Sequence, residues 1–304
     1  MSLRALYMRA AGRLPVAWRR RLESLPVHVF RWQHEIQIRK AWRSGPPYKP
    51  THRRIIIDIT ADCNLGCVDC NRSCGPEQAP SRENMSPAQV ERFVAESVRS
   101  GRRWEAILIE GGEPALHPQF REIVAILEEY RRVHSPGTWI QVNTNGYRAC
   151  SQRVLAGLPK TWEVYSSNKR GRVQPGHLAF NVAPADLAEF ASADFSGGCM
   201  QPAQFGLGLT RHGYYPHPAC GGIDRVFGFD IGRKSLPSPD DDLRDQCRRL
   251  CRYCGCFRLF NRACQSRFDM RPSPEEQARR GEMTASWREA YRKYRVAPPR
   301  LTLY

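Results

Sequence analysis

Three cysteines within eight residues constrain this chain more than any other feature. Cys63, Cys67 and Cys70 directly follow the apolar run at residues 55–59, which is rich in isoleucine. A β-branched run of this kind predicts a buried strand, so the thiols are expected on a loop that leaves it. Residues 1–30 lack the apolar core of a signal peptide, and thiols this close in a reducing compartment are metal ligands more often than disulfide partners. The sequence therefore predicts a metal site at the end of a strand in a cytoplasmic protein.

The spacing favours iron over zinc. Structural zinc sites pair two short knuckles, and no second knuckle lies near this loop. Closely spaced cysteines on one loop are the usual sequence form of a [4Fe–4S] cluster. Three thiolates leave one iron open, and an open coordination position distinguishes a reactive metal site from a structural one.

A second motif completes a family resemblance. Gly111-Gly112-Glu113-Pro114 follows the apolar stretch 106–109, and together with the C-x3-C-x2-C loop it resembles the radical S-adenosylmethionine (AdoMet) enzymes. The resemblance implies that the open iron binds AdoMet and that one electron, from a donor such as flavodoxin or ferredoxin, cleaves it to a 5′-deoxyadenosyl radical. The two glycines would let a ligand approach the backbone, and Glu113 would supply negative charge for an ammonium group.

Two positions depart from the family pattern. The family often has an aromatic residue before the third cysteine, whereas this chain has Asp69. Cys74 follows Cys70 at a further x3 spacing, and a fourth thiolate would close the cluster and make it an electron carrier. That alternative stays open, although a carrier has no need of the Gly-Gly-Glu-Pro stretch.

Alternation of strands and helices predicts the fold. Helices are expected from Ser86, with Pro87 and Gln89 as N1 and capping partner, and from near Pro118. Strands are expected at 55–59, 106–110, 138–142, 162–165 and 178–182. This order predicts an α/β fold with a parallel sheet, which the resemblance makes a partial (β/α)6 barrel, incomplete because no full helix fits before 178–182. Cofactor contacts are predicted at the carboxyl ends of its strands, and they comprise Gly111, Gly112, Glu113, Pro114, Asn143, Asn145, Ser166 and Ser167.

A second group of cysteines begins at Cys199. Its members are Cys199, Cys220, Cys247, Cys251, Cys254, Cys256 and Cys264. A β-hairpin is predicted at 205–216 between the first two, and the pattern resembles the Twitch half of SPASM/Twitch extensions. The resemblance implies an auxiliary [4Fe–4S] cluster on Cys199, Cys220, Cys251 and Cys254. Cys247 is a rival ligand because it repeats the C-x3-C-x2-C spacing, and zinc at these thiols also stays open.

The remaining sequence predicts how the chain is divided. Residues 1–50 form a basic amphipathic arm and linker, 51–190 the barrel, 191–270 the auxiliary domain and 271–304 a terminal helix, running from about Ser273 to Arg295, and a tail. Residues 1–54 hold thirteen Lys or Arg against two Glu, which is most of the net charge of +17. The arm is expected to pack on its own barrel or to bind an anionic membrane surface or partner. Nucleic acid is a weaker expectation because the chain has no recognised binding motif.

The cysteine inventory separates two reaction outcomes. A four-thiolate cluster would accept an electron from a substrate radical, which favours two-electron oxidation of a hydroxyl-bearing small molecule or sugar. A free thiol in the site would instead return hydrogen and give an epimerase, with Cys247, Cys256 and Cys264 as candidate donors. A peptide substrate also stays open, as does a metal-stabilised binding protein.

Overall fold

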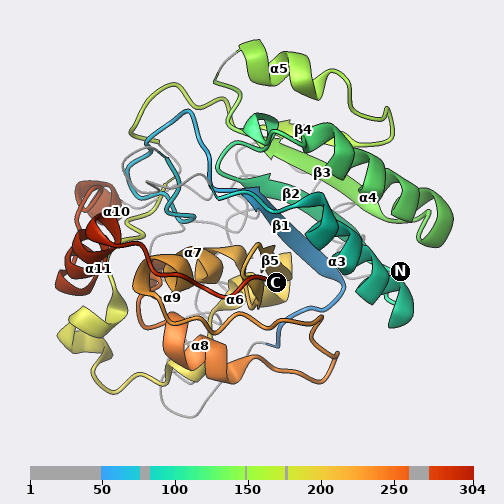
Figure 1. Cartoon of the computed structure of the whole chain (residues 1–304). Helices are drawn as coiled ribbons and strands as arrows, with labels where there is room; N and C mark the ends of the chain where they lie inside the picture. The colour runs from blue at the N-terminus through green and yellow to red at the C-terminus, as the bar shows by residue number, and fades with distance from the viewer. Residues whose placement is uncertain (1–48, 76–82, 148, 175–176, 260–273) are drawn as a thin grey trace, which may run out of the picture.

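The computed structural model describes residues 49–75, 83–147, 149–174, 177–259 and 274–304 (Figure 1). Most of the predicted arm, Cys264 and the predicted helix start at Ser273 lie outside these ranges, so the expectations attached to them stay predictions. Within the described part of the chain, none of the helices combines the length and hydrophobicity needed to span a bilayer.

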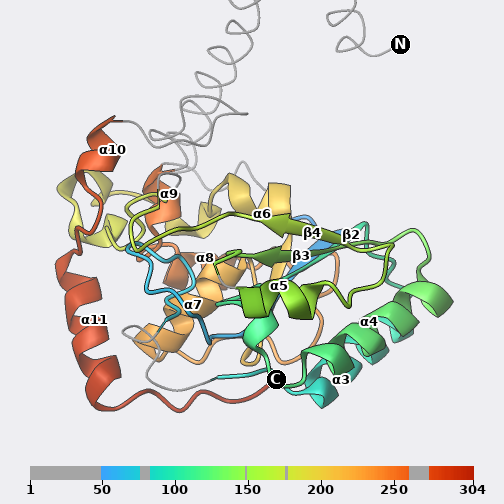
Figure 2. The ribbon, with the colours of Figure 1, turned by 90° about the horizontal axis from the view of Figure 1, so that it is seen from above.

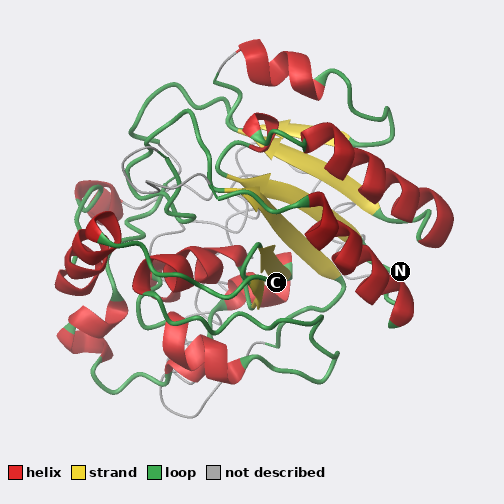
Figure 3. Cartoon of the chain, in the orientation of Figure 1, coloured by secondary structure: helices red, strands yellow, loops and turns green. Residues whose placement is uncertain are grey.

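The centre of the molecule is one six-stranded sheet (Figures 1 and 3). Its order is β4-β3-β2-β1-β5-β6, with every neighbouring pair parallel except β5 and β6. The strands are β1 (Arg54–Thr60), β2 (Ala106–Gly111), β3 (Trp139–Thr144), β4 (Glu163–Ser166), β5 (Leu207–Thr210) and β6 (Gly213–Tyr215). The parallel-dominated sheet confirms the predicted α/β class and fits a partial barrel.

Two amphipathic helices cover one face of the sheet. Figure 2 shows α3 (Pro87–Arg99) and α4 (Phe120–His134) side by side along it. The predicted capping box is confirmed, because the Ser86 hydroxyl accepts from the Gln89 N–H while the Gln89 side chain accepts from the Ser86 N–H. Alternate strand residues bury their side chains against these helices in the main core, including Ile55, Ile57, Ile59, Ile107, Ile109, Ile140 and Val142.

The opposite strand positions carry polar groups toward the carboxyl ends. Asp58 pairs in register with Glu110 on β2, and Asn143 pairs with Tyr165 on β4. Because successive strand residues point to opposite faces of the sheet, the strands present apolar side chains to the helices on one face and polar side chains to the site on the other.

Smaller helices complete the other side and the sheet edges. They are α5 (Ala149–Leu155), α6 (Met200–Phe205), α7 (Pro218–Phe227), α8 (Arg244–Leu250), α9 (Gly255–Leu259), α10 (Pro274–Ala278) and α11 (Ala285–Val296). The prediction of one helix from about Ser273 to Arg295 is wrong, since the chain breaks between α10 and α11 around Gly281, whose φ of 77° is left-handed. Helix α11 buries Trp287, Tyr291 and Tyr294, so it contributes aromatic side chains to the packed interior.

The predicted strand at 178–182 is also wrong. Ala179, Phe180 and Val182 are buried, but their segment is irregular. The Phe180 carbonyl accepts from the Gly255 N–H at 3.1 Å, and the Asn181 carbonyl accepts from the Thr284 N–H at 3.1 Å. This backbone therefore bonds to C-terminal segments and not to the sheet.

The hairpin predicted at 205–216 is confirmed as β5 and β6. Strand β5 pairs with β1, so residues assigned to the auxiliary domain extend the sheet of the barrel. Gly206, with φ 92°, lies where a Cβ would come within 2.0 Å of the Arg54 carbonyl oxygen. A glycine is therefore needed for the hairpin to dock against β1.

Candidate metal and cofactor site

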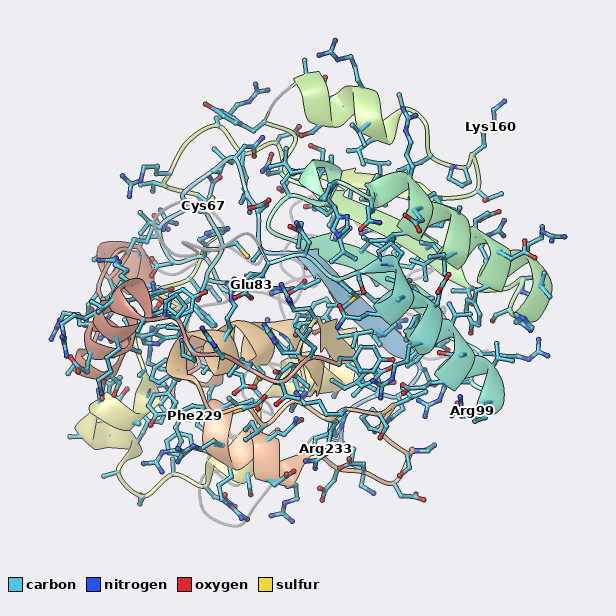
Figure 4. The ribbon with its side chains drawn as sticks, viewed as in Figure 1. Cys67, Glu83, Arg99, Lys160, Phe229 and Arg233 are labelled. Carbon is cyan, nitrogen blue, oxygen red and sulfur yellow. The ribbon has the colours of Figure 1, made fainter. Side chains whose placement is uncertain are left out.

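A cavity of about 800 Å³ opens at the carboxyl ends of β1 to β4. Its wall includes Cys63, Cys67 and Cys70 together with Gly111 and Gly112. It also includes Glu110, Asn143, Thr144, Asn145, Tyr165, Ser167, Lys169, Gln174 and His177. The structure thus brings the two motifs together, about forty residues apart in the chain, in a cavity of the size used for small-molecule ligands. Figure 4 shows Cys67 on the side where α11 packs, away from Lys160 and Arg99.

The three sulfurs lie among hydrogen-bond donors. The Cys74 thiol and the backbone N–H groups of Cys74 and Arg72 lie against the Cys70 sulfur, and these contacts, that of the Cys74 thiol first, hold the pKa of the Cys70 thiol well below its usual range. The Cys74 S–H itself donates to the Arg72 carbonyl oxygen at 3.4 Å. Burial raises the pKa of Cys63 to about 11, although the Leu65 N–H opposes this. Donors aimed at sulfur stabilise a negative thiolate.

Side chains supply two longer contacts to the other sulfurs. The Asn145 amide lies 3.7 Å from the Cys63 sulfur, and the Gln174 amide lies 3.8 Å from that of Cys67. Burial raises the pKa of Cys67, against the positive charge of Lys169. The Asn64 side-chain nitrogen is buried beside Cys63 with no hydrogen-bond partner among the described residues. These donors fit a [4Fe–4S] cluster held by three thiolates.

The glycine pair has a structural task that the sequence did not reveal. A Cβ on Gly111 would come within 2.3 Å of the Thr60 carbonyl oxygen, and one on Gly112 within 2.1 Å of that of Asp62. The Gly112 N–H donates to the Thr60 carbonyl and the Glu113 N–H donates to the Asp62 carbonyl, each at 2.7 Å. The pair therefore lets β2 close against the start of the cysteine loop and also lines the cavity.

Glu113 has other partners than the predicted ligand ammonium. Its side chain is fully buried and accepts from the Thr144 hydroxyl at 2.8 Å and from the Asn145 N–H at 2.8 Å. Burial raises the pKa of the Glu113 carboxyl, and these hydrogen bonds oppose the shift. The carboxylate fixes the end of β3, while Pro114 begins a short 3-10 turn behind it.

Some of the predicted polar residues line the cavity, and others stabilise the backbone behind it. Asn145 lies on the wall, where its amide also donates to the Asn64 side chain at 2.8 Å. Ser167 is on the wall as well, but its hydroxyl donates to the Thr144 carbonyl at 3.1 Å. The Ser166 hydroxyl is bonded to Asn168 at 3.0 Å and belongs to the turn after β4.

An ion-pair network forms the floor of the cavity. Arg72 bonds Asp58 at 3.0 Å and Glu110 at 2.6 Å, and Glu110 also accepts from the Asn143 amide. Burial raises the pKa of Asp58 to about 6, and Arg72 opposes that shift. Sequence reasoning missed Arg72, Glu110, Lys169, Gln174 and His177. A charged residue at the end of a buried strand, as at Glu110, was the available signal.

The second group of cysteines is gathered in one buried place. All six described members are buried, and none is joined in a disulfide to another described residue; they are Cys199, Cys220, Cys247, Cys251, Cys254 and Cys256. Cys251 contacts both Cys220 and Cys247, and Cys254 contacts Cys256. Cys199 lies within electrostatic reach of Cys254 and Cys220, and burial raises the pKa of its thiol well above the usual range. The four predicted ligands are therefore neighbours, with Cys247 and Cys256 among them.

Two kinds of metal centre differ in how they would use these thiols. A single zinc ion would take four thiolates on one metal, whereas a cuboidal cluster places each thiolate on a separate iron. The charge of Arg72 acts on Cys254 and on Cys70, so both groups of thiols lie within electrostatic reach of this residue.

Of the predicted hydrogen donors, Cys264 lies outside the described residues, and the other two do not line the main cavity. Neither Cys247 nor Cys256 is on its wall, and Cys247 lines a separate cavity of about 260 Å³ with Cys199. Besides the three predicted ligands, Cys74 is the thiol of the described chain that reaches the main cavity.

Comparison with known proteins agrees with the geometry of the first site. A family model described as "Radical SAM superfamily" matches residues 57–160. The chain is 32% identical over 74 residues to a "Probable GTP 3′,8-cyclase" of Pyrococcus horikoshii, covering 24% of this chain and 22% of that protein. It is 30% identical over 107 residues to a "GTP 3′,8-cyclase" of Corynebacterium glutamicum, covering 35% of this chain and 27% of that protein. The chain thus spans about a quarter of the length of these curated relatives.

One solved structure covers more of the chain at lower similarity. It is described as BtrN in complex with AdoMet and 2-DOIA, is 14% identical, and covers 68% of this chain and 94% of its own, with a TM-score of 0.41.

Proposed function

Because the chain belongs to the radical SAM superfamily through residues 57–160, we propose that it cleaves AdoMet at a [4Fe–4S] cluster held by Cys63, Cys67 and Cys70. One observation carries this proposal: the three cysteine sulfurs, with hydrogen-bond donors beside them, line the same cavity as Gly111 and Gly112. When bound, the cluster and AdoMet would supply one-electron cleavage chemistry that starts a radical reaction on the substrate.

The chain's own groups would bind and orient these cofactors. Asn145 and Gln174 donate toward two of the sulfurs. The Glu113 carboxylate holds the backbone that carries Asn145. Lys169 lies on the same wall and supplies positive charge beside Cys67. A reduced electron donor such as flavodoxin or ferredoxin is part of the proposal.

The reaction we propose is two-electron oxidation of a hydroxyl-bearing small molecule or sugar. The polar floor of Glu110 and Asn143, with Tyr165 beside it, suits a substrate with several hydroxyl groups. The second group of thiols supports the same proposal, because an auxiliary [4Fe–4S] cluster on Cys199, Cys220, Cys251 and Cys254 would accept the electron that the substrate loses. The matched relatives named as cyclases are not oxidoreductases, and their similarity covers only part of this chain.

Epimerisation is the second candidate for the reaction. It needs a thiol on the cavity wall to return hydrogen to the substrate carbon. Cys247 and Cys256 are not on that wall, whereas Cys74 is. This distribution favours oxidation unless Cys74 serves as the donor.

The cleavage reaction tests the proposal. Anaerobically reconstituted and reduced protein should convert AdoMet to 5′-deoxyadenosine and methionine, both measured by liquid chromatography. Cys67→Ala should abolish both products, while Cys256→Ala should retain them. Intact AdoMet in the presence of a reduced, fully loaded cluster would refute the enzyme and leave an electron carrier.

Iron, sulfide and zinc counts test the auxiliary cluster separately. The double variant Cys220→Ser/Cys254→Ser should lose about half of the iron and sulfide and retain the AdoMet-responsive cluster. Zinc in the wild-type protein that disappears from this variant would assign the second site to zinc. Once a substrate is found, reaction in D2O separates oxidation, with no deuterium gained at carbon, from epimerisation, with deuterium incorporated.

A further inference from the structure

The wall of the main cavity carries more positive than negative charge. Among the described residues that line it, Arg72, Lys169 and Arg170 are cations, and Glu110 is the one carboxylate. Arg72 is paired with Glu110 at 2.6 Å and with Asp58 at 3.0 Å. Lys169 and Arg170 have no ion pair with a described carboxylate. These two cations are therefore available to a ligand.

Both cations lie on the segment that follows β4, and the backbone of this segment is tied down on both sides of Arg170. The Lys169 N–H donates to the Asn145 carbonyl at 2.8 Å, and the Val68 N–H donates to the Arg172 carbonyl at 2.8 Å. The first bond joins the segment to the end of β3, and the second joins it to the cysteine loop. The fold thus fixes the backbone that carries both cations at the cavity wall.

The neighbouring titratable groups do not cancel this positive charge. Burial, and after it the charge of Lys169, lowers the pKa of the His177 imidazole, so this wall residue is neutral at pH 7. The Glu113 carboxylate is fully buried and bonded to the end of β3, and it is not on the wall. The side chain of Arg170 is exposed, which leaves it accessible to a molecule that enters the cavity.

The cofactors of the proposed function do not remove the excess either. A [4Fe–4S] cluster on three thiolates carries a net negative charge, whereas AdoMet carries a net positive charge because its sulfonium and ammonium groups outnumber its carboxylate. These two charges offset each other, so the cavity stays positive with both cofactors in place. A cleft lined by charge of one sign concentrates ligands of the opposite sign.

The cavity also has space and apolar surface for a second molecule beside AdoMet. Its volume of about 800 Å³ lies in the upper part of the range of small-molecule sites. Tyr165 and Val173 are 58% and 60% exposed on the same wall. An aromatic ring can pack against the C–H face of a sugar ring, while the hydroxyl groups reach the polar floor.

We propose that the substrate is a monosaccharide-sized molecule that carries a phosphate or carboxylate group, and that Lys169 and Arg170 bind this acidic group. The inference rests on the proposed function and narrows its substrate class. A hydrogen bond between a cationic side chain and a phosphate or carboxylate is stronger than one between neutral groups. The two residues would therefore select anionic sugars over neutral ones.

Binding of three sugars that share one ring tests the inference. Glucose is neutral, glucuronate carries a carboxylate, and glucose 6-phosphate carries a phosphate. Each is titrated by calorimetry into the anaerobically reconstituted protein with AdoMet added and the cluster left oxidised, so that no turnover occurs. At least one anionic sugar should bind about tenfold more tightly than glucose, and the two anionic arms distinguish phosphate from carboxylate. Added salt should reduce this preference, because it screens exposed charges.

Variants of Arg170 assign the preference to this wall. Arg170→Gln should weaken binding of the anionic sugar about tenfold and leave the affinity for glucose unchanged. Arg170→Lys keeps the charge and should recover most of the loss. Arg121→Gln is the matched control, because Arg121 is an exposed arginine of α4 that does not line the cavity. It should retain the wild-type affinity for all three sugars.

The outcomes separate this inference from the proposed function. If wild-type protein with a full cluster leaves AdoMet intact on reduction, the proposed function fails and the inference with it. If it cleaves AdoMet but binds the three sugars equally, or binds none of them, the inference alone is overturned. An anionic preference that survives Arg170→Gln overturns it as well. So does a loss of AdoMet affinity in Arg170→Gln as large as the loss for the sugar, since Arg170 would then belong to the AdoMet site.

Discussion

Replacing Gly112 with alanine should displace the cysteine loop, although Gly112 itself lies outside that loop and follows the neighbouring strand β2. The new Cβ would lie 2.1 Å from the Asp62 carbonyl oxygen and 3.0 Å from that of Ala61. Both neighbours are backbone atoms, so neither can swing aside as a side chain would. Relief requires the segment between β1 and Cys63, which contains Ala61 and Asp62, to move by about 1 Å or more, and overpacking of this kind costs about 1–3 kcal/mol.

Two backbone hydrogen bonds weaken with the same movement. They join the Gly112 N–H to the Thr60 carbonyl and the Glu113 N–H to the Asp62 carbonyl, each at 2.7 Å. A hydrogen bond contributes about 1 kcal/mol to stability. Together the terms predict that the free energy of unfolding falls by about 3–5 kcal/mol, and that the loop holds less iron because Cys63 is displaced.

Urea denaturation followed by circular dichroism measures the first effect, and iron content after reconstitution measures the second. Gly137→Ala is the matched control, because a Cβ on this exposed glycine meets nothing within 4 Å. Its unfolding midpoint and iron content should equal those of the wild type. Equal midpoints and equal iron in Gly112→Ala and Gly137→Ala would refute the reasoning.

Three further predictions concern buried charges. Burial raises the pKa of Asp58 from 3.8 to about 6. The contribution of Asp58 to the free energy of unfolding should therefore decline as pH rises from about 4 to about 6. In urea titrations across that pH range, the free energy of unfolding of Asp58→Asn should vary less with pH than that of the wild type. Glu113→Ala should lower the free energy of unfolding by about 2–4 kcal/mol, because it leaves the Asn145 N–H without its carboxylate. The control Glu91→Ala, at an exposed position, should not change it. Equal urea midpoints for the two variants would contradict this prediction. Arg258→Met should lower the free energy of unfolding by about 3–5 kcal/mol because it removes the buried ion pair with Glu276. A loss no larger than that of Arg132→Met, which breaks an exposed pair, would count against it.

Strands and helices with strong periodicity could be predicted from the sequence. The isoleucine run of β1, the capping box of α3 and the helical spacing of Ile123, Leu127 and Tyr130 each specify a local structure that tertiary packing supports. The hairpin of β5 and β6 was predictable for the same reason. Its place beside β1 was not, because pairing between distant strands leaves no local signal.

Failures occurred where tertiary contacts decide the conformation. The stretch 178–182 has strand composition, yet its carbonyls bond to Gly255 and Thr284 from segments far along the chain. Helix α7 was overlooked, although Pro218 at its first turn and left-handed Gly228 at its end are recognisable start and stop signals.

The cysteine loop of the candidate site was predictable from the sequence, and the residues that hold this loop in place were not. Spacing alone placed Cys63, Cys67 and Cys70 on one loop, and the structure puts that loop on the cavity wall. The Glu113 carboxylate bonds to the end of β3, which no local pattern signals, and its predicted contact with a ligand ammonium stays a prediction. Arg225 and Tyr291, which hold the loop from more than 140 residues away, could not be identified without the fold.

The central claim is that three thiolates leave one iron open to AdoMet. Mössbauer spectroscopy of the Cys220→Ser/Cys254→Ser variant, reconstituted with ⁵⁷Fe, tests it most directly, because this variant should retain only the cluster at Cys63, Cys67 and Cys70. Adding AdoMet should change the isomer shift of one iron site and leave the others in place. Identical spectra with and without AdoMet, together with loss of one iron site's ligation in Cys74→Ala, would contradict the claim and show a closed, four-thiolate cluster.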